Sequence, residues 1–299
     1  MKRILKSKHF IPICYSLFFI SVFVVFFYSS FPEEAVKQRM IYEIGKRTPL
    51  TVEIKNVSIS PITRITAYGV NLYKDKELFL VVDEWSGSPS LLYLIINKLK
   101  VPFEANLYGG GAEGTLFYDL KNNKITKAEG KIENGIDIGK ISAIPEVLGG
   151  ENSLVQGVLN GDFSLEFSSQ PKGDINLTIN DLMVKGVKIA GGFPLPDFGK
   201  MQSSFKSHIE KGVTKVDELK FKGSKIDLTL SGTMPLLWQI TKHGTIDLSV
   251  SLKADRDVGR TITGLLSAFL ATQRDGSLGG KIIGTISRPE IVKQVVNNR

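Results

Sequence analysis

The most regular feature of this sequence is an alternation of apolar and polar residues that returns along most of its length. In the stretch GSKIDLTLSG, residues 223–232, isoleucine and leucine occupy every second position and polar residues lie between them. Successive side chains of a β-strand point to opposite faces, so this period of two predicts a strand with one apolar and one solvated face. Antiparallel sheets tolerate such two-sided strands, whereas central parallel strands are usually apolar throughout.

The same alternation recurs elsewhere, often directly after a glycine. Such stretches begin at Leu50, Val101, Thr115, Gly161, Gly173 and Gly244. Their spacing is irregular, which argues against a solenoid of fixed repeat length. Short polar segments such as KNNK at 121–124 suit hairpin turns. The sequence therefore predicts a mainly β protein built on a long, curved, mostly antiparallel sheet, shaped as a gutter or a sandwich, with a few short helices.

A different pattern occupies the first thirty residues. The run from Phe10 to Phe31 contains no Asp, Glu, Lys or Arg. As a helix it would be about 33 Å long at about 1.5 Å per residue, enough to cross a hydrocarbon core of about 30 Å. Four basic residues precede it, and positive charge stays on the cytoplasmic side of a membrane. We therefore expect a cytoplasmic tail at 1–9 and a single transmembrane anchor at 10–31 in the inner membrane.

A cleaved signal peptide is the alternative interpretation of this segment. Its apolar core would be about 7–15 residues long and would end in small residues. The run here is longer, and the bulky Phe26, Phe27 and Tyr28 lie near its end, which favours an uncleaved anchor. Ser29 and Ser30 leave cleavage open.

The segment after the anchor predicts a connecting helix at residues 32–48. Pro32 suits the first position of a helix, and apolar residues from Ala35 to Ile44 fall on one side. Further helices are predicted at 91–100, at 141–148, at 258–272 and after Pro289. Residues 49–299 are expected to form one periplasmic β-rich domain.

Composition and charge narrow the class of protein. The chain is 42% hydrophobic and 23% charged, which is typical of an ordered protein. Its net charge of +8 includes four basic residues of the tail, so the remainder carries 38 − 4 = 34 positive against 30 negative charges. Nucleic-acid binding requires clustered positive charge. We therefore expect no nucleic-acid partner.

Residues that could carry chemistry are few and scattered. Cys14 is the only cysteine and lies within the apolar run, which excludes a disulfide within the chain and a thiolate cluster. His9, His208 and His243 are far apart in the sequence. We expect no metal site, no cofactor and no catalytic residue.

Two matches to catalytic or nucleotide-binding motifs are weak. GGGAEG at 109–114 fits G-x-G-x-x-G, but a strand follows it where a helix N-terminus would be needed to bind pyrophosphate. A hairpin turn is predicted there instead. Ser203 and Lys206 fit S-x-x-K without its supporting motifs. We expect the chain not to be an enzyme.

The apolar face of the predicted sheet requires a cover. What covers this face is the main question about the function of the protein. The candidate residues lining an apolar groove are Ile226, Leu228, Leu230, Ile246, Leu248 and Val250. An open groove would shield acyl chains, at about 0.8 kcal/mol per buried methylene. Alternatively, these residues form a closed core under the helix predicted at 258–272. The pattern favours neither interpretation.

Several stretches follow the anchor in an order that characterises a known family. They are FPEEAVKQRMIYEIGKRTPLTVEI (31–54), GVNLY (69–73), SPSLLYLIINKLKVPFEANLYGGGAEG (88–114), GGFPLPDFGKMQSSFKSHIEKGVTKVDELKFKGSKIDLTLSGTM (191–234) and GSLGGKIIGTISRPEI (276–291). In this order they resemble the type II secretion system protein N family, which belongs with the AsmA-like group of membrane-anchored proteins.

The resemblance implies a non-enzymatic, inner-membrane-anchored component of the type II protein secretion system with a periplasmic β-rich domain. Other secretion subunits would be its partners, and the resemblance supplies no catalytic residue. The wider AsmA-like group resembles lipid-handling proteins with grooved sheets, so a lipid-binding or lipid-transfer module is the alternative function. The chain is shorter than the large AsmA-like proteins, which argues against a bridge across the whole periplasm.

Overall fold

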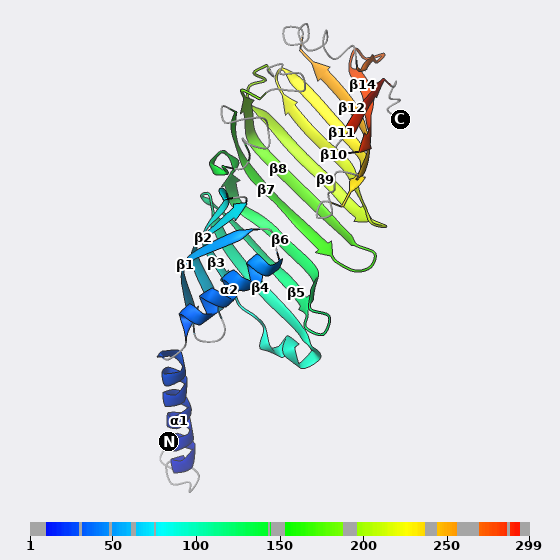
Figure 1. Cartoon of the computed structure of the whole chain (residues 1–299). Helices are drawn as coiled ribbons and strands as arrows, with labels where there is room; N and C mark the ends of the chain where they lie inside the picture. Colours follow the sequence, from blue (N-terminus) through cyan, green and yellow to red (C-terminus); the bar gives the residue numbers. More distant parts are fainter. Residues whose placement is uncertain are drawn as a thin grey trace, which may run out of the picture.

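One long sheet forms the body of the molecule, with two helices at one end (Figure 1). The computed structural model describes residues 10–29, 32–47, 50–60, 64–74, 76–142, 144, 153–187, 196–236, 244–255, 269–285 and 288–293. The helices are α1 (Phe10–Ser29), α2 (Glu33–Arg47) and the 3-10 turns η2 (Leu91–Ile96) and η3 (Ile138–Lys140). The strands are β1 (Thr51–Ser60), β2 (Arg64–Lys74), β3 (Glu77–Gly87), β4 (Lys98–Leu107), β5 (Gly110–Asp119), β6 (Lys124–Asp137), β7 (Leu154–Glu166), β8 (Lys172–Lys185), β9 (Met201–Glu210), β10 (Val213–Gly223), β11 (Ile226–Pro235), β12 (Thr245–Ala254), β13 (Ala271–Thr272), β14 (Leu278–Thr285) and β15 (Arg288–Lys293).

The described strands pair in an almost purely sequential order. Each strand from β1 to β12 hydrogen-bonds to the next one along the chain, β14 follows β12, and both β13 and β15 pair with β14. Every ladder between the described strands is antiparallel, a geometry that short hairpin turns can connect. Figure 1 shows the sheet twisting along its length, with β1 beside α2 and β14 near the C-terminus. The predicted mainly β, antiparallel fold is confirmed.

The register across the strands produces one apolar face. Directly opposed residues of paired strands project to the same side, and one such row crosses the sheet from β1 to β15 without a charged side chain. The row consists of Ile59, Ile65, Gly87, Phe103, Gly114, Gly130, Phe163, Ile175, Ser207, Val216, Gly232, Leu248, Ile282 and Ile291. We call the side that carries it the inner face.

The adjacent row lies on the opposite side, which we call the outer face, and it is polar throughout. It consists of Ser58, Thr66, Ser86, Glu104, Glu113, Lys131, Asp162, Asn176 and Lys206. The two rows lie one residue apart along each strand, and successive side chains of a strand point to opposite faces. The alternation of apolar and polar residues in the sequence therefore corresponds to the apolar inner face and the polar outer face.

Three buried clusters stabilise different parts of this sheet. At one end, α2 packs its apolar side on β1 and β2, where Val57 and Ala67 are fully buried. A second cluster joins β7 and β8 to β11, β12 and β14 and includes Leu182, Ile226 and Leu252. A third, smaller cluster contains Ile175, Ile209 and Leu236.

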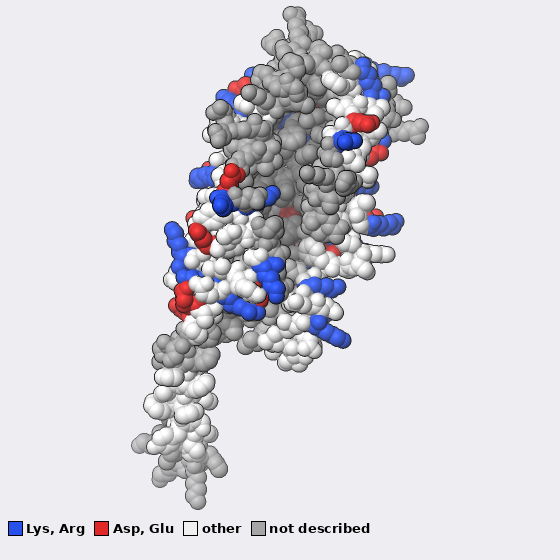
Figure 2. All heavy atoms as spheres, viewed as in Figure 1, with Lys and Arg blue, Asp and Glu red and all other residues white. Residues whose placement is uncertain are grey.

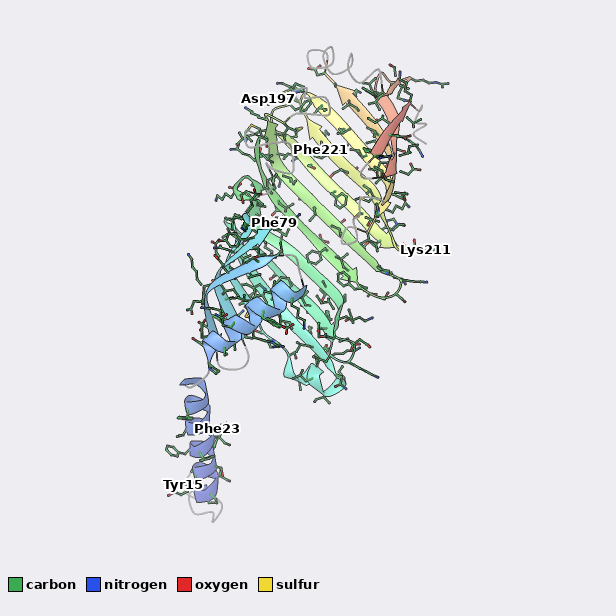
Figure 3. All side chains as sticks on the ribbon, in the orientation of Figure 1. Tyr15, Phe23, Phe79, Asp197, Lys211 and Phe221 are labelled. Carbon is green, nitrogen blue, oxygen red and sulfur yellow. The ribbon has the colours of Figure 1, made fainter. Side chains whose placement is uncertain are left out.

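Helix α1 lies apart from the sheet and is apolar over its described surface. Figure 2 shows no charged atoms on it, and Figure 3 shows Tyr15 and Phe23 pointing away from its axis. The side chains described on α1 are those of residues 12–23 and residue 26. Within the described part of the chain, no helix combines the length and the apolar character that crossing a membrane requires. The anchor expected at 10–31 includes positions 30 and 31, outside the described residues, and it stays a prediction.

Two of the predicted helices are corrected by the structure. The helix expected at 91–100 ends after the single 3-10 turn η2, because Asn97 adopts a left-handed conformation (φ 53°) and β4 begins at Lys98. Residues 290–293 of the helix expected after Pro289 belong to the strand β15, which pairs with the edge of β14, and residues 294–299 lie outside the described residues.

The other predicted helices fall in part outside the described residues. Most of 141–148 and all of 258–268 lie outside them, and Ala271–Thr272 form the strand β13 rather than the end of a helix. Helix α2 covers Glu33–Arg47, within the range 32–48 expected for a connecting helix.

The hairpin turn predicted at GGGAEG is confirmed. Tyr108 and Gly109 both have positive φ angles (51° and 81°) and connect β4 to β5, which begins at Gly110. Two left-handed residues between paired strands form a tight turn whose twist suits the sheet. A strand follows the glycines, so no helix N-terminus is present here to bind a nucleotide phosphate.

Candidate functional site: an apolar groove beside α2

Among the described residues, the side chains that could carry catalytic chemistry do not meet, and His9 and His243 lie outside the described residues. Ser203 is buried on the inner face opposite Ile179, whereas Lys206, three positions later in the same strand, belongs to the outer row. Nδ1 of His208 lies 2.8 Å from a carboxylate oxygen of Asp217 in a partly exposed pair. Among the described residues, no three His, Cys, Asp or Glu side chains gather as a metal site.

The six residues predicted to line a groove lie together on two neighbouring strands. Strands β11 and β12 are adjacent, Leu230 pairs with Val250, and positions 226, 228, 246 and 248 share that face. Ile226 and Val250 are buried, and the other four are half-buried. Ile226 belongs to the cluster of Leu252 and Leu278, so this end of the inner face is packed by the chain itself.

The open part of the inner face lies at the other end of the sheet, next to α2. A hollow of about 820 Å³ is present there, and we call it the α2 groove. It is lined by Arg39, Glu43, Trp85, Leu99, Val101, Leu116, Tyr118, Ile125 and Phe167. This volume is within the range of about 300–1,000 Å³ found for ligand sites.

The floor of the α2 groove is formed by two neighbouring rows of paired residues. Val101 faces Leu116 across β4 and β5. Two residues further along, Leu99 faces Tyr118, which in turn faces Ile125 of β6. The side chains of each row share a face because they are directly opposed in the ladders. The floor is therefore apolar across three strands.

Phe167 closes one side of the floor just after β7 ends. Its backbone N–H donates a hydrogen bond to the carbonyl oxygen of Thr126 (2.8 Å), which extends the β6–β7 ladder by one step. Tyr118, by contrast, brings a polar group to the groove, and its hydroxyl contacts the side-chain oxygen of Asn123 in the β5–β6 turn. The floor of the groove is thus apolar, except for the hydroxyl group of Tyr118 at the end of the sheet.

Helix α2 forms the charged wall of the groove. Val36, Met40 and Ile44 pack on β1 and β2, which leaves Arg39 and Glu43 on the side of the helix that borders the groove. These two side chains form an ion pair one helical turn apart, and the Arg39 guanidinium lies 5.6 Å from the centre of the Tyr42 ring. Charged groups therefore border an apolar floor.

Apolar side chains at this end of the sheet remain open to solvent. Ile125 belongs to β6 and Leu120 directly follows β5, and each is 43% exposed. Exposed apolar surface of this kind, rimmed by polar groups, marks binding sites more often than a solvated face does. The arrangement would hold an elongated apolar ligand and offers no nucleophile with an adjacent base.

Hollows on the outer face differ in chemistry. Two of them, of about 350 and 570 Å³, share Lys131 and are otherwise lined largely by Glu, Asp, Asn and glycine. Glu133 raises the pKa of Lys131 by accepting a hydrogen bond from its ammonium group (2.7 Å). These depressions lie over the polar row, whereas the α2 groove is lined mainly by apolar side chains.

Comparison of this chain with known protein families, curated proteins and solved structures found no match.

The sequence pattern does not identify the residues that line the α2 groove, although it contains part of the information needed to find them. Val101 and Leu116 belong to stretches whose alternation was visible, and the pattern predicted that they face the same side as Leu228 and Leu230. Alternation identifies an apolar face but carries no information on which part of that face the rest of the chain covers.

Proposed function

We propose that this chain is a non-enzymatic, membrane-tethered module that binds lipid acyl chains on the inner face of its sheet. The observation that carries the proposal is the α2 groove, an open hollow of about 820 Å³ whose floor is apolar and whose wall carries Arg39 and Glu43. A lipid combines the two complementary parts, an apolar chain for the floor and a polar headgroup for the rim.

The energetics of this fit are favourable. Each methylene moved from water to an apolar surface contributes about 0.8 kcal/mol, so ten buried methylenes would contribute about 8 kcal/mol before the cost of ordering the chain. The continuous apolar row across the sheet extends the same surface beyond the groove. Lipid binding on a grooved sheet is also the function that the resemblance to the AsmA-like group implies.

A membrane tether at α1 would place the groove next to its ligand. The segment 10–31 has no charged residue, and its helix of 20 residues would be about 30 Å long. Phe18 and Phe19 are 68% and 71% exposed, an arrangement that lipid stabilises and water does not. With basic residues before α1, the sheet would lie on the periplasmic side of the inner membrane.

The experiment is to purify the full chain in a mild detergent and identify bound lipid by native mass spectrometry and lipid extraction. We expect lipid with the wild type and its loss in Leu116→Asp, which puts a charge on the groove floor. Thr115→Asp is the matched control, because it adds the same charge one residue away on the outer face.

Circular dichroism of each variant would verify folding. A wild type that repeatedly carries no lipid, or a folded Leu116→Asp variant that retains it fully, would contradict the proposal.

A second function is favoured by the edge strand β15, which pairs only with β14 among the described strands. All six residues of β15 are exposed, with Ile291 at 45% and Val292 at 43%. An exposed edge strand is a template for pairing with a strand of another chain. Together with the resemblance described above, this edge supports a structural component of the type II secretion machinery that binds other subunits.

The test is to capture the natively expressed full chain and identify the proteins that come with it. We expect secretion subunits, and we expect Ile291→Pro or Val292→Pro to lose them, since proline removes a donor from the edge. Repeated recovery of no secretion subunit would exclude this role.

A further inference from the structure

The short turn η2 carries an uncovered cluster of large apolar side chains. Leu92 and Ile95 are 77% and 80% exposed, and Leu94 and Ile96 are 41% and 58% exposed. We call these four side chains the η2 knob. Leu92 and Ile95 are three residues apart and therefore lie on the same side of the 3-10 helix, with Leu94 and Ile96 next to Ile95 in the chain. Exposed apolar side chains gathered in this way mark contacts with a membrane or a partner.

The backbone presents the η2 knob in a defined position. The N–H of Ser90 donates to the carbonyl of Lys100 (2.8 Å), and the N–H of Asn97 donates to that of Leu94 (3.0 Å). The carbonyl of Asn97 accepts from the N–H of Leu120 (3.1 Å), which joins the turn to the β5–β6 hairpin. The apolar tip is therefore part of the folded sheet end.

The charges around the η2 knob are mainly positive. Lys98 and Lys100 lie two and four residues after Ile96, Lys121 lies in the β5–β6 turn that Asn97 contacts, and Lys124 begins β6. Asp119 is the acidic group of this turn, and its carboxylate already accepts hydrogen bonds from the N–H groups of positions 121 and 122.

Lys100 also contacts aromatic rings at this end of the sheet. Its Nζ lies 5.9 Å from the centre of the Tyr93 ring and 5.7 Å from that of Phe117. Apolar side chains surrounded by lysines and aromatic rings match the interface of a bilayer, where acyl chains meet anionic headgroups.

The position of η2 fits this chemistry. In Figure 1 the cyan turn η2 lies at the end of the sheet nearest α1, at about the height at which α1 ends. The α2 groove opens at the same end, since Leu99 lies three residues after the end of η2 and pairs with Tyr118.

We propose that the η2 knob inserts into an anionic lipid leaflet, as a second contact with the membrane that carries α1. This inference rests on the proposed membrane attachment of the chain and adds the surface that holds the groove against the bilayer. An acyl chain leaving the leaflet would then meet Leu99 and Ile125 without crossing water.

The experiment uses the full chain with one fluorescent label. Cys14 is the only cysteine, so Cys14→Ser provides a background in which Ile95→Cys can be labelled with an environment-sensitive dye. Lys211→Cys is the matched control, because its side chain is 83% exposed in the β9–β10 turn, away from η2 (Figure 3). Both proteins are reconstituted in vesicles of phosphatidylethanolamine and phosphatidylglycerol containing lipids with a spin label at shallow depth.

We expect these lipids to quench more than half of the emission at position 95 and little at position 211. Lys121→Glu combined with Lys124→Glu should reduce the quenching at position 95, as should vesicles of phosphatidylcholine alone. Quenching at 95 no greater than at 211, in protein that floats with the vesicles, would overturn this inference and leave lipid binding in the groove standing.

Two further outcomes are informative. If the full chain does not float with vesicles at all, the attachment through α1 fails, and the inference fails with it. If position 95 is shielded in native membranes and stays unquenched in pure lipid vesicles, a protein covers the η2 knob and the lipid contact is wrong.

Discussion

At the scale of single residues, glycines on the inner face make room for aromatic rings. Gly114 and Gly130 are the cross-strand neighbours of Phe103 and Phe163. A Cβ atom at Gly114 would lie 2.8 Å from the ring of Phe103, and one at Gly130 would lie 2.9 Å from the ring of Phe163. These distances are shorter than real contacts, so each ring lies against the backbone of the next strand because no side chain is present there.

We predict that Gly130→Val destabilises the protein by about 1–3 kcal/mol, because overpacking forces Phe163 or the backbone to move. Urea unfolding followed by circular dichroism measures this change. Thr115→Val, on the outer face of β5, is the control and should stay within about 0.5 kcal/mol of the wild type. Equal effects of the two substitutions would show that the inner face is loosely packed at this point.

A second residue-scale feature is the fully buried Thr214 on β10. Its hydroxyl has no hydrogen-bond partner among the described residues. A buried polar group without a partner is destabilising, whereas an apolar group of the same shape is not. The pattern of the sequence does not reveal this position, since threonine is common on strands.

We predict that Thr214→Val raises the free energy of unfolding by about 1 kcal/mol. Ser204→Ala gives the opposite comparison, because it removes a hydroxyl that donates to Glu218 (3.0 Å). Unfolding of both variants in urea would compare the two effects, and a destabilised Thr214→Val variant would mean that the hydroxyl has a partner.

At the scale of elements, the β5–β6 hairpin depends on one carboxylate. Asp119 accepts hydrogen bonds from the N–H groups of Lys121 (2.9 Å) and Asn122 (3.0 Å) and from the side-chain amide of Asn122 (2.8 Å). The bonds from Asn122 are the main cause that lowers the pKa of Asp119 below its ordinary value of 3.8. The charged form of this carboxylate therefore stabilises the turn.

Because the folded pKa is depressed, the stability that Asp119 contributes is fully present above the ordinary pKa and is lost as the pH falls through the folded pKa. We predict a thermal midpoint that is steady near neutral pH and falls below about pH 4. Asp119→Asn should have a smaller fall over the same range, with the remainder due to groups such as Asp197 and Asp275, whose pKa values are also lowered. Identical acid profiles for the two proteins would count against this role.

Elements differed in how well the sequence predicted them. Strands such as β11 and β12 are predictable, because their alternation of apolar and polar residues repeats over most of their ten residues. The sequence pattern wrongly predicts a helix after Pro289, because a strand at a sheet edge forms only when its neighbouring strand is present. The apolar run at 91–96 likewise predicts a longer helix. In the structure the chain bends back at Asn97, because β4 pairs with β5.

At the scale of the whole molecule, the sheet resembles a linear array. Each strand pairs mainly with its sequence neighbours, and the first cluster, on β1 and β2, shares no strand with the other two, which both include residues of β8 and β9. Arrays with nearest-neighbour contacts open in local units and do not always unfold as one body.

We predict that a cavity in the third cluster loosens only its own surroundings. Ile209 is 3% exposed, and Ile209→Ala should cost about 2–5 kcal/mol locally. Hydrogen exchange should rise for amides of β8 to β10 and stay unchanged in β1 and β2. Val57→Ala, in the first cluster, should produce the reverse pattern. A uniform rise in both variants would show that the sheet unfolds cooperatively.

The sequence by itself determined that the strands are two-sided, since the period of two follows from the geometry of a strand and needs no distant contact. It also determined the absence of charge in 10–31 and the hairpin at Tyr108 and Gly109. Tertiary structure alone decided which part of the apolar face is open. The face near Ile226 is packed by β7, β8 and β14, and the face near Leu116 is left open beside α2. Such covering depends on contacts between residues far apart in the chain, and local alternation does not encode them.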